Sequence, residues 1–418
     1  MAKPLKLTMA PGLQKYDCTG CGGCCRGRFA IIITDADRER IVEQGWTDEQ
    51  LELKGKPLFT PLGSEFQLAH RADGSCVFLQ EDGLCAIHAK YGEPAKPLAC
   101  RMYPFRLIPV GTQIRVDVRF DCPASATNLG RPITVHKEDL AELMKLAIPA
   151  DKAAALEPPP IFGAVPKTWA QFSRITQTFE QVLLDVSIDI TRRMRACVNL
   201  VDLIHRSEIE PLSGRDLEEF LDTAVSIVQE EAVYDDLERK PPSGMVRTAF
   251  RQLIGVYGRL DSVADRSKPL ERLSTSMRMY GGKGVIPPLR EDFPRVTFAD
   301  VEAARGIPTG EAALAVERYL SVHLASMGFF GMPFYGRSYV DGMNALLLTY
   351  PLVCWYARVF AIHEGLTVPD TSCIERALMI VDHQHGITPV LDTPGEKFRT
   401  KFLCEQDTLR SLISWYGS

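Results

Sequence analysis

The spacing of apolar residues changes near residue 132 and divides the chain into two parts. Before that point, apolar residues occur in short runs or alternate with polar ones, a pattern typical of β-strands separated by turns. Beyond it, they recur at every third or fourth position over long stretches, as in helices that bury one face. The pattern predicts an α+β fold, with a small mixed domain over residues 1–132 and a larger all-α domain over residues 133–418.

Within the first part, a strand, a helix and a hairpin can be assigned. Residues 29–33 form an apolar run that predicts a buried strand, and Thr34 follows as a candidate N-cap for a helix. Residues 105–120 predict a β-hairpin that turns at Gly111. Its second strand should bury one face and expose the other, because four apolar positions alternate with three charged ones: Ile114, Val116, Val118 and Phe120 with Arg115, Asp117 and Arg119.

The second part is predicted to be a series of helices. Helical spacing covers residues 139–148, 167–185, 188–205, 245–260, 311–326, 339–361, 373–383 and 397–415, with a further helix start at Ser213. A proline-rich linker lies at 157–160, and a stretch rich in glycine and proline predicts a sub-boundary at 281–297. Residues 281–284 could cradle a phosphate, but they lack the flanking strand and helix of a P-loop, which favours a simple turn.

Cysteine is concentrated in the first part, where eight of the twelve cysteines lie between residues 18 and 122. Four of them form the run Cys18-Thr-Gly-Cys21-Gly-Gly-Cys24-Cys25, whose glycines permit the φ > 0 conformations needed to wrap several thiolates around one inorganic centre. Adjacent Cys24 and Cys25 suit two centres, or a cluster with several irons, better than one tetrahedral zinc. Other chain segments present the remaining four: Cys76, Cys85, Cys100 and Cys122.

The main alternative is that these cysteines form disulfides, which requires an oxidising compartment. The first ten residues contain two lysines and no apolar stretch of the kind found in a secretory signal, so a cytoplasmic location is expected. In a reducing compartment, the same cysteine pattern favours metal binding or catalysis over disulfides.

Composition and charge narrow the range of partners. The content of 45% hydrophobic and 24% charged residues is ordinary for a globular protein, and the formal net charge of −5 gives no basic footprint for nucleic acid. The most apolar stretch, residues 345–362, contains Pro351 and Arg358. It is therefore predicted to be a buried helix, and no membrane span is expected.

Several further residues have both a structural and a functional interpretation. His88 is the histidine best placed to join the cysteine ligands, although a histidine on a short helix is often only a surface residue. His383 and His385 lie at a helix end, where they can simply complement the helix dipole. The four later cysteines occur among apolar residues and are interpreted as small core residues: Cys197, Cys354, Cys373 and Cys404.

The order of the cysteine motifs resembles a known family. The CxxCxxCC run is followed by Cys76-Val-Phe-Leu, by Gly83-Leu-Cys85-Ala-Ile-His88 and by Cys100-Arg-Met-Tyr-Pro. This order is similar to that of the YkgJ-type cysteine-cluster proteins, which are described as zinc- or iron-chelating domains and include the flagellin lysine-N-methylases. The resemblance covers roughly residues 16–125. A weaker similarity, by pattern and order, links residues 317–320, 346–360 and 381–385 to the C-terminal half of the methylases.

The resemblance implies that the eight cysteines are the ligand set, and that iron, as an iron–sulfur cluster such as [4Fe-4S], is a candidate beside zinc. It also suggests an enzyme: an S-adenosylmethionine-dependent protein-lysine N-methyltransferase with a protein substrate such as flagellin. The sequence contains neither a glycine-rich adenosyl-binding turn between a strand and a helix nor the CxxxCxxC loop of radical enzymes, so no catalytic residue is assigned. The alternative function is a non-catalytic zinc or iron–sulfur protein whose helices serve as an interaction surface.

A surface for a protein partner is expected between residues 281 and 339, where a loop rich in glycine and proline meets four aromatic residues: Phe329, Phe330, Phe334 and Tyr335. The competing interpretation is that these rings pack into the core between helices.

Overall fold

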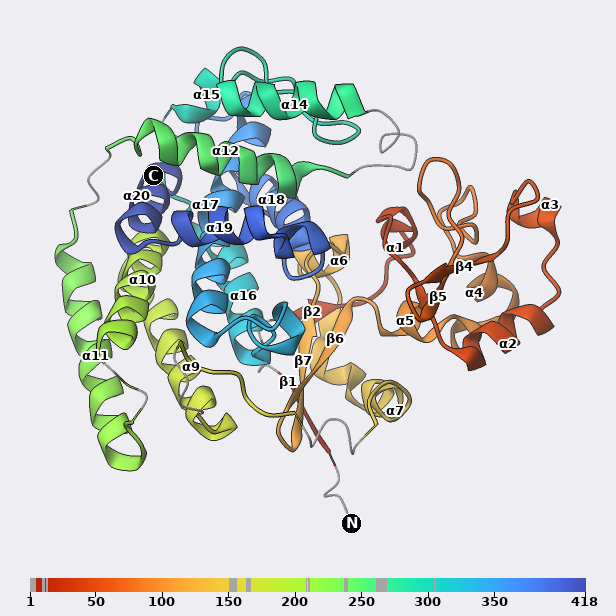
Figure 1. The fold of residues 1–418 in the computed structure, drawn as a ribbon, viewed down its shortest axis with the longest axis horizontal. Helices are drawn as coiled ribbons and strands as arrows, with labels where there is room; N and C mark the ends of the chain where they lie inside the picture. The colour runs from red at the N-terminus through yellow and green to blue at the C-terminus, as the bar shows by residue number, and fades with distance from the viewer. Residues whose placement is uncertain are drawn as a thin grey trace.

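The computed structural model describes residues 5–9, 12, 14–149, 156–162, 167–207, 209, 211–236, 240–260, 269–303 and 306–418. Figure 1 shows a small lobe, residues 18–103, that projects from one side of a large and mainly helical body. Most strands lie in the first third of the chain and long helices make up the rest. The α+β prediction is confirmed.

The lobe contains a three-stranded antiparallel sheet in the order β3-β5-β4, built from β3 (Ile32–Ile33), β5 (Glu65–Leu68) and β4 (Phe59–Leu62). The strand predicted at 29–33 is therefore shorter than expected. Around the sheet lie five short helices: α1 (Gly23–Arg26), α2 (Asp35–Glu43), α3 (Asp48–Leu51), α4 (Ala86–Tyr91) and α5 (Leu98–Met102).

Thr34 caps α2 as predicted. Its side-chain oxygen accepts a hydrogen bond from the Asp37 N–H, and the Asp37 carboxylate accepts one from the Thr34 N–H, at 3.1 and 3.2 Å. This reciprocal capping box satisfies two backbone donors that the helix itself leaves unpaired.

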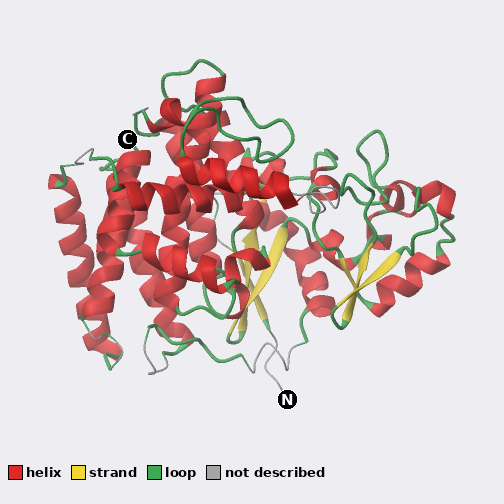
Figure 2. Cartoon of the chain, turned by 45° about the horizontal axis from the view of Figure 1, so that its top comes forward, coloured by secondary structure: helices red, strands yellow, loops and turns green. Residues whose placement is uncertain are grey.

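The body carries a second sheet, in the order β1-β7-β6, which Figure 2 shows apart from the sheet of the lobe. The hairpin of β6 (Phe105–Val110) and β7 (Gln113–Val118) is confirmed, and β1 (Lys6–Met9) adds to it in parallel with β7. A two-residue ladder joins β2 (Lys15–Tyr16) to β8 (Arg131–Pro132), which brings the chain just before the first cysteine back to the body.

The polar face predicted for β7 is not open to solvent at Asp117, which is completely buried. Helix α16 (Gly310–Ser326) packs on this strand, and its His323 places Nδ1 3.0 Å from Asp117 Oδ1. Arg106 Nη1 lies 3.4 Å from the same carboxylate. Alternation along one strand cannot reveal that a distant helix covers its second face, so the charged position had been assigned to the surface.

The remaining helices of the body agree with the predicted ones to within a few residues, apart from four differences. Helix α6 and the two helices that flank the stretch rich in glycine and proline, α14 and α15, had no predicted counterpart, and the helix predicted at 397–415 is divided into α19 and α20. The helices are α6 (Pro123–Ala126), α7 (Lys137–Ala147), α9 (Trp169–Leu183), α10 (Ile190–Arg206), α11 (Gly214–Tyr234), α12 (Gly244–Gly258), α14 (Pro269–Gly281), α15 (Phe298–Glu302), α16, α17 (Tyr339–His363), α18 (Thr371–Gln384), α19 (Pro394–Leu403) and α20 (Gln406–Tyr416), with 3₁₀ turns η1 (Glu93–Ala95), η2 (Ile133–His136), η3 (Met332–Phe334) and η4 (Pro389–Asp392).

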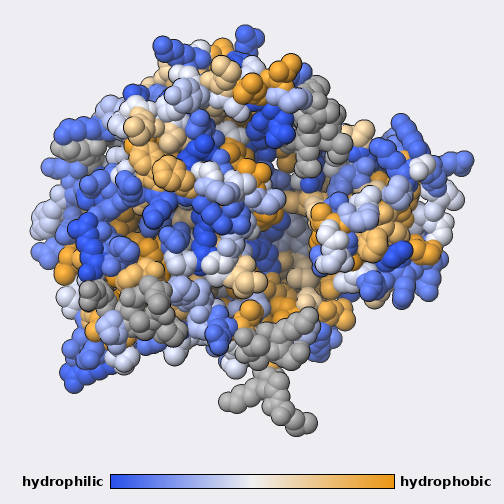
Figure 3. All heavy atoms as spheres, in the orientation of Figure 1, coloured by the Kyte–Doolittle hydropathy of each residue, from blue (hydrophilic) through white to orange (hydrophobic). Residues whose placement is uncertain are grey.

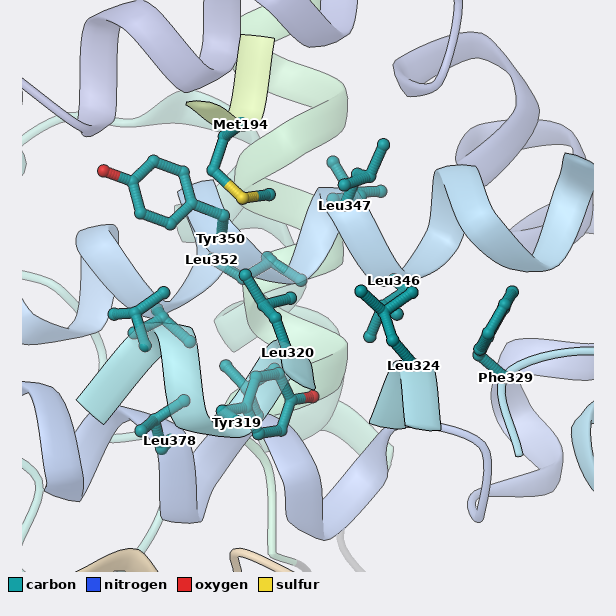
Figure 4. Close-up of a cluster of buried hydrophobic side chains, with 14 of the residues drawn as sticks. Met194, Tyr319, Leu320, Leu324, Phe329, Leu346, Leu347, Tyr350, Leu352 and Leu378 are labelled. Atoms are coloured by element: carbon teal, nitrogen blue, oxygen red, sulfur yellow. The ribbon is translucent and has the colours of Figure 1, made fainter. Parts of the chain in front are cut away.

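Helix α17 lies at the centre of the body. By length and composition it could cross a membrane, but 94% of its most apolar window is buried inside the protein. Figure 4 shows Leu346 and Leu347 of this helix among side chains of neighbouring helices, including Met194 and Leu320. The prediction of a buried helix here is confirmed.

The aromatic surface expected between residues 281 and 339 is wrong. Phe329, Phe330 and Phe334 are each only 2% exposed, and Tyr335 packs against the same core. Residues 281–284 form the turn at the end of α14, and a side chain on Gly282 would lie 2.4 Å from the Arg251 guanidinium. Close packing against Arg251 thus requires glycine at position 282, and the simple turn was the better interpretation of residues 281–284.

The described residues form two separate hydrophobic cores. The smaller one lies in the lobe and centres on Phe78 and Ile41, whereas the larger one joins the β1-β7-β6 sheet to the helices. The hairpin thus shares its core with the helical part of the chain. A domain boundary at residue 132 stays a prediction.

Candidate metal centre

The first cysteine run occupies a loop that leaves β2 and enters α1. Cys18 and Cys21 lie in the loop and Cys24 and Cys25 on the helix. Gly22, at φ 66°, stands at the left-handed position that starts α1. A side chain there would lie 2.6 Å from the Gly83 carbonyl oxygen, so the close approach of this loop to the turn at residues 81–84 requires glycine.

That turn carries the second pair of cysteines. Cys76 and Cys85 are each held by an isolated β-bridge, to His70 and Leu79 respectively. The Cys76 N–H also donates to the Cys25 carbonyl at 2.8 Å, which ties this segment to α1. The backbone therefore brings Cys25 and Cys76 together before any side-chain interaction is considered.

The last two cysteines come from further along the chain. Cys100 lies on α5, and Cys122 is the N-cap residue of α6, directly after the end of the hairpin. Cys76 and Cys122 are buried, Cys25, Cys85 and Cys100 are partly buried, and Cys18, Cys21 and Cys24 are exposed. Among the described residues all twelve cysteines are free thiols, with no disulfide.

The thiols of the lobe interact with one another. A hydrogen bond with the Cys24 thiol lowers the pKa of Cys25, but a hydrogen bond with Cys76, burial and the charges of Cys76 and Cys85 outweigh it and raise that pKa to about 12. Burial raises the pKa of Cys100, and Cys25 and Cys85 add to this effect while Lys96 opposes it. Thiols crowded in this way keep their protons, and a bound cation would replace those protons and cancel the repulsion between thiolates.

The pKa of Tyr16 is affected by several of the other thiols. Burial is the main reason that the pKa of its hydroxyl is raised, followed by the charges of Cys18 and Cys122, a hydrogen bond with the Cys18 thiol and the charge of Cys24. A side chain added to Gly23 would meet both the Cys21 Sγ and the Cδ of Pro123, each at 3.4 Å. The first cysteine run therefore lies close to the end of the hairpin, where Cys122 is located.

The spacing of the thiols bears on the kind of metal. In the described part of the chain, one set of three ligand atoms lies within 4.8 Å of one another, and it comes from Glu364, Asp370 and Cys373 rather than from the eight predicted cysteines. A zinc ion about 2.3 Å from each sulfur would hold its thiolates roughly 3.8 Å apart. No three of the eight predicted thiols, as described, lie at that spacing.

The Glu364 group has structural partners. Glu364 pairs with Arg376, and Asp370 caps α18 by accepting a hydrogen bond from the Cys373 N–H at 2.9 Å. Cys197, Cys354 and Cys373 are buried in the large core and Cys404 packs against it, so their interpretation as core residues is confirmed.

His88 and two arginines near the cysteines have distinct positions. His88 is exposed on α4, so its role as a ligand stays a prediction. Arg26 donates to the Cys21 carbonyl at 2.7 Å and Arg101 pairs with Glu93 at 3.2 Å. Arg26 thus braces the loop of the first cysteine run, a role that its sequence position did not specify.

A cleft of about 950 Å³ lies between the lobe and the body, and the surface is hollowed there in Figure 3. The lobe contributes Arg28, Phe29 and His70, and the body contributes residues of α12, α14 and α18. Phe29 and His383 meet across it with ring centroids 4.5 Å apart.

His383 was interpreted mainly as complementing a helix dipole, with a catalytic role as the alternative, and the structure gives it a specific partner. Its Nδ1 lies 3.2 Å from Asp121 Oδ2, and Asp121 also accepts hydrogen bonds from Arg119 and from the Tyr103 hydroxyl, at 2.6 and 3.1 Å. Burial lowers the pKa of His383, although Asp121 opposes this, so the imidazole is neutral at pH 7. A neutral imidazole oriented by a buried carboxylate at a cleft can accept a proton.

A second buried network was missed because its members are far apart in sequence. His323 bridges Asp117 and Asp382 at 3.0 and 3.1 Å, and the Asp382 carboxylate accepts a hydrogen bond from the Phe120 N–H at 2.6 Å. Burial opposes the charged imidazole, but the two carboxylates outweigh it and raise the pKa of His323 to about 9. The motif around Asp382 was visible in the sequence, whereas its partners were not.

Comparison with known proteins identifies the cysteine segment alone. Residues 17–123 match the model of the CxxCxxCC family, whose description reads "Putative zinc- or iron-chelating domain". The searches of curated proteins and of solved structures gave no match. The matched segment begins one residue before Cys18 and ends one residue after Cys122, so it includes all eight predicted ligands. Residues 17–123 are therefore similar to the zinc- or iron-chelating domain that this family describes, which supports metal binding by this segment.

Proposed function

We propose that this protein binds iron, as an iron–sulfur cluster such as [4Fe-4S], through eight cysteine thiolates: Cys18, Cys21, Cys24, Cys25, Cys76, Cys85, Cys100 and Cys122. The observation that supports the proposal is that the Cys76 N–H donates to the Cys25 carbonyl on α1 at 2.8 Å, and that Cys25, Cys85 and Cys100 pack against the same small core as Cys76. Thiolates are the ligands that iron–sulfur clusters and zinc prefer.

Two features support iron over a single zinc ion. Eight thiols exceed the four ligands of a tetrahedral zinc site, and no three of them, among the described residues, lie within 4.8 Å of one another. A reducing compartment such as the cytoplasm would keep them available as free thiols.

The bound metal would stabilise the fold of the lobe. If the protein is not an enzyme, this structural role is the only function of the metal. The core of the lobe is small, and its cysteines lie inside or against it. In structural sites of this kind the energy of metal binding is also energy of folding. The lobe would then be a metal-dependent module attached to a self-sufficient helical body.

A second function, protein-lysine N-methylation, is favoured by one observation: the cleft beside the cysteine domain contains a neutral His383 oriented by Asp121. A lysine ammonium must lose a proton before its nitrogen can attack, and His383 Nε2 would accept that proton. S-adenosylmethionine would supply the methyl group. Flagellin is the protein substrate that the sequence resemblance suggests.

One preparation can test both functions. The chain is purified without oxygen, and iron, zinc and acid-labile sulfide are quantified per chain. Iron together with sulfide would support the iron–sulfur cluster, whereas zinc without iron would indicate a zinc site instead. Absence of both metals would refute metal binding. The same sample is then tested by calorimetry for S-adenosylmethionine binding and by mass spectrometry for methylation of flagellin, with His383→Gln as the matched variant. No binding and no methylation would leave the non-catalytic function.

A further inference from the structure

We infer that the eight cysteines form two adjacent metal centres, each with four thiolates, and that the second of these fastens the lobe to the body. The core group consists of Cys25, Cys76, Cys85 and Cys100. The boundary group consists of Cys18, Cys21, Cys24 and Cys122. The inference rests on the proposed metal binding and adds to it a division of the ligands and a mechanical role.

The core group is defined by its place in the small hydrophobic core. Cys76 is one of the buried members of that core, and the other three cysteines pack against it. The backbone agrees with this placement, because the Cys76 N–H donates to the Cys25 carbonyl at 2.8 Å and the Ala86 N–H, next to Cys85, donates to the carbonyl of Phe78 in the same core at 2.8 Å. All four come from the lobe, so their centre is internal to it.

The boundary group lies where the two cores meet. Cys122 belongs to the large core of the body, whereas Cys18, Cys21 and Cys24 are exposed and belong to neither core. A side chain on Gly23 of the first run would meet both the Cys21 Sγ and the Cδ of Pro123, each at 3.4 Å, and Pro123 directly follows Cys122. The first run therefore lies beside the end of the hairpin, at the edge of the body.

Helix α1 explains how one short segment can serve both groups. Consecutive residues on an α-helix project about 100° apart, so Cys24 and Cys25 face different directions. Because the two residues are adjacent in the chain, the two centres would be neighbours. A single four-thiolate centre would leave four of the eight thiols without a role.

The boundary centre would add a metal link to the contacts that already join the two parts at this junction. Arg28 donates to the Leu260 carbonyl, and Phe29 lies against His383 across the cleft. Asp121, which orients His383, directly precedes Cys122. Metal bound to Cys122 and to the first run would fix the lobe at the edge of the cleft.

The experiment compares the full-length chain with Cys18→Ala and Cys85→Ala, one variant for each group, purified without oxygen. Each is expected to keep roughly half of the wild-type metal and sulfide, because the other group remains intact, and the double variant should keep none. Cys21→Ala and Cys100→Ala repeat the comparison with a second member of each group. Cys404→Ala, a thiol outside both groups, is the control and should keep all of the metal.

Fluorinated tryptophan provides a readout that does not depend on metal content. Trp46 packs on Phe78 in the small core, with ring centroids 5.4 Å apart, and the other three tryptophans lie in the body. Its ¹⁹F resonance should move in Cys85→Ala and stay in place in Cys18→Ala. In Cys18→Ala, scattering should instead show a longer molecule, because the lobe is attached less tightly to the body.

Three results would overturn the inference. If both single variants lost all of their metal, the eight cysteines would form one shared centre. If either variant kept the full wild-type metal content, the group of the substituted cysteine would not bind metal. If scattering gave the same molecular dimensions for Cys18→Ala as for the wild type, the boundary centre would not fasten the lobe to the body. Wild-type protein that contains neither iron nor zinc would instead refute the proposed function itself.

Discussion

The lobe and the body reach stability by different means. Among the described residues the core of the lobe contains ten buried hydrophobic side chains, one of them Cys76, whereas the body buries every turn of α17 and most of the helices around it. A domain with a small core gains relatively more stability from a metal or a crosslink. The comparison predicts that the lobe depends on bound metal more strongly than the body does.

The largest effect should follow metal removal. Treatment with a strong chelator under denaturant-free conditions should unfold the lobe and leave the body folded, because a structural thiolate site contributes on the order of 10 kcal/mol. The ¹⁹F resonance of Trp46 should move to its unfolded position while that of Trp355, which is fully buried in the body, stays unchanged. A chelated protein in which both resonances keep their positions would mean that the lobe has sufficient core of its own.

A cavity made in the core of the body should destabilise the body and leave the metal content of the lobe unchanged. Leu352 on α17 is completely buried, so Leu352→Ala should lower the free energy of unfolding of the body by about 3–5 kcal/mol. Metal and sulfide content should remain at the wild-type level. If the variant lost its metal while folded, the two parts would be coupled far more tightly than their separate cores indicate.

The buried His323 network predicts a pH dependence that belongs to the body. The folded-state pKa of about 9 is above the value of 6.5 for an unfolded histidine, so the stabilisation is fully present below pH 6.5 and is lost as the pH rises through 9. It amounts to about 3 kcal/mol. Denaturation of wild type and His323→Gln between pH 6 and 10 measures it, and their difference should shrink with increasing pH. A constant difference would contradict a charged His323.

The smallest effect compares two helix caps. Thr34 caps α2 in the lobe and Thr168 caps α9 in the body, each through a capping box. Thr34→Ala and Thr168→Ala should each cost about 1 kcal/mol. Hydrogen exchange should localise each loss to its own part. Loss of protection in the body from Thr34→Ala would argue against the independence of the two parts.

Local patterns in the sequence were sufficient wherever the structure depends on local chemistry. The alternation from Ile114 to Phe120 predicted the hairpin, Thr34 predicted the start of α2, and the cysteine spacing identified the domain. Helix α17 could be recognised as buried because proline and arginine interrupt its apolar run. These features need no knowledge of distant partners.

What the sequence did not reveal depends on contacts across the chain. Asp117 alternates like a surface residue, yet His323, some two hundred positions later, covers it. Phe329 and Phe330 beside a glycine-rich loop resembled a binding surface, but the rings pack on Tyr339 in the core. His383 acquires its orientation from Asp121, which no helical pattern could connect to it.

X-ray absorption at the iron and zinc edges of the anaerobically purified chain tests the central claim most directly. The account predicts bound iron whose first shell is sulfur at about 2.3 Å, with a metal–metal distance that a single zinc ion would not give. A protein without metal, or a metal with only oxygen and nitrogen neighbours, would contradict it.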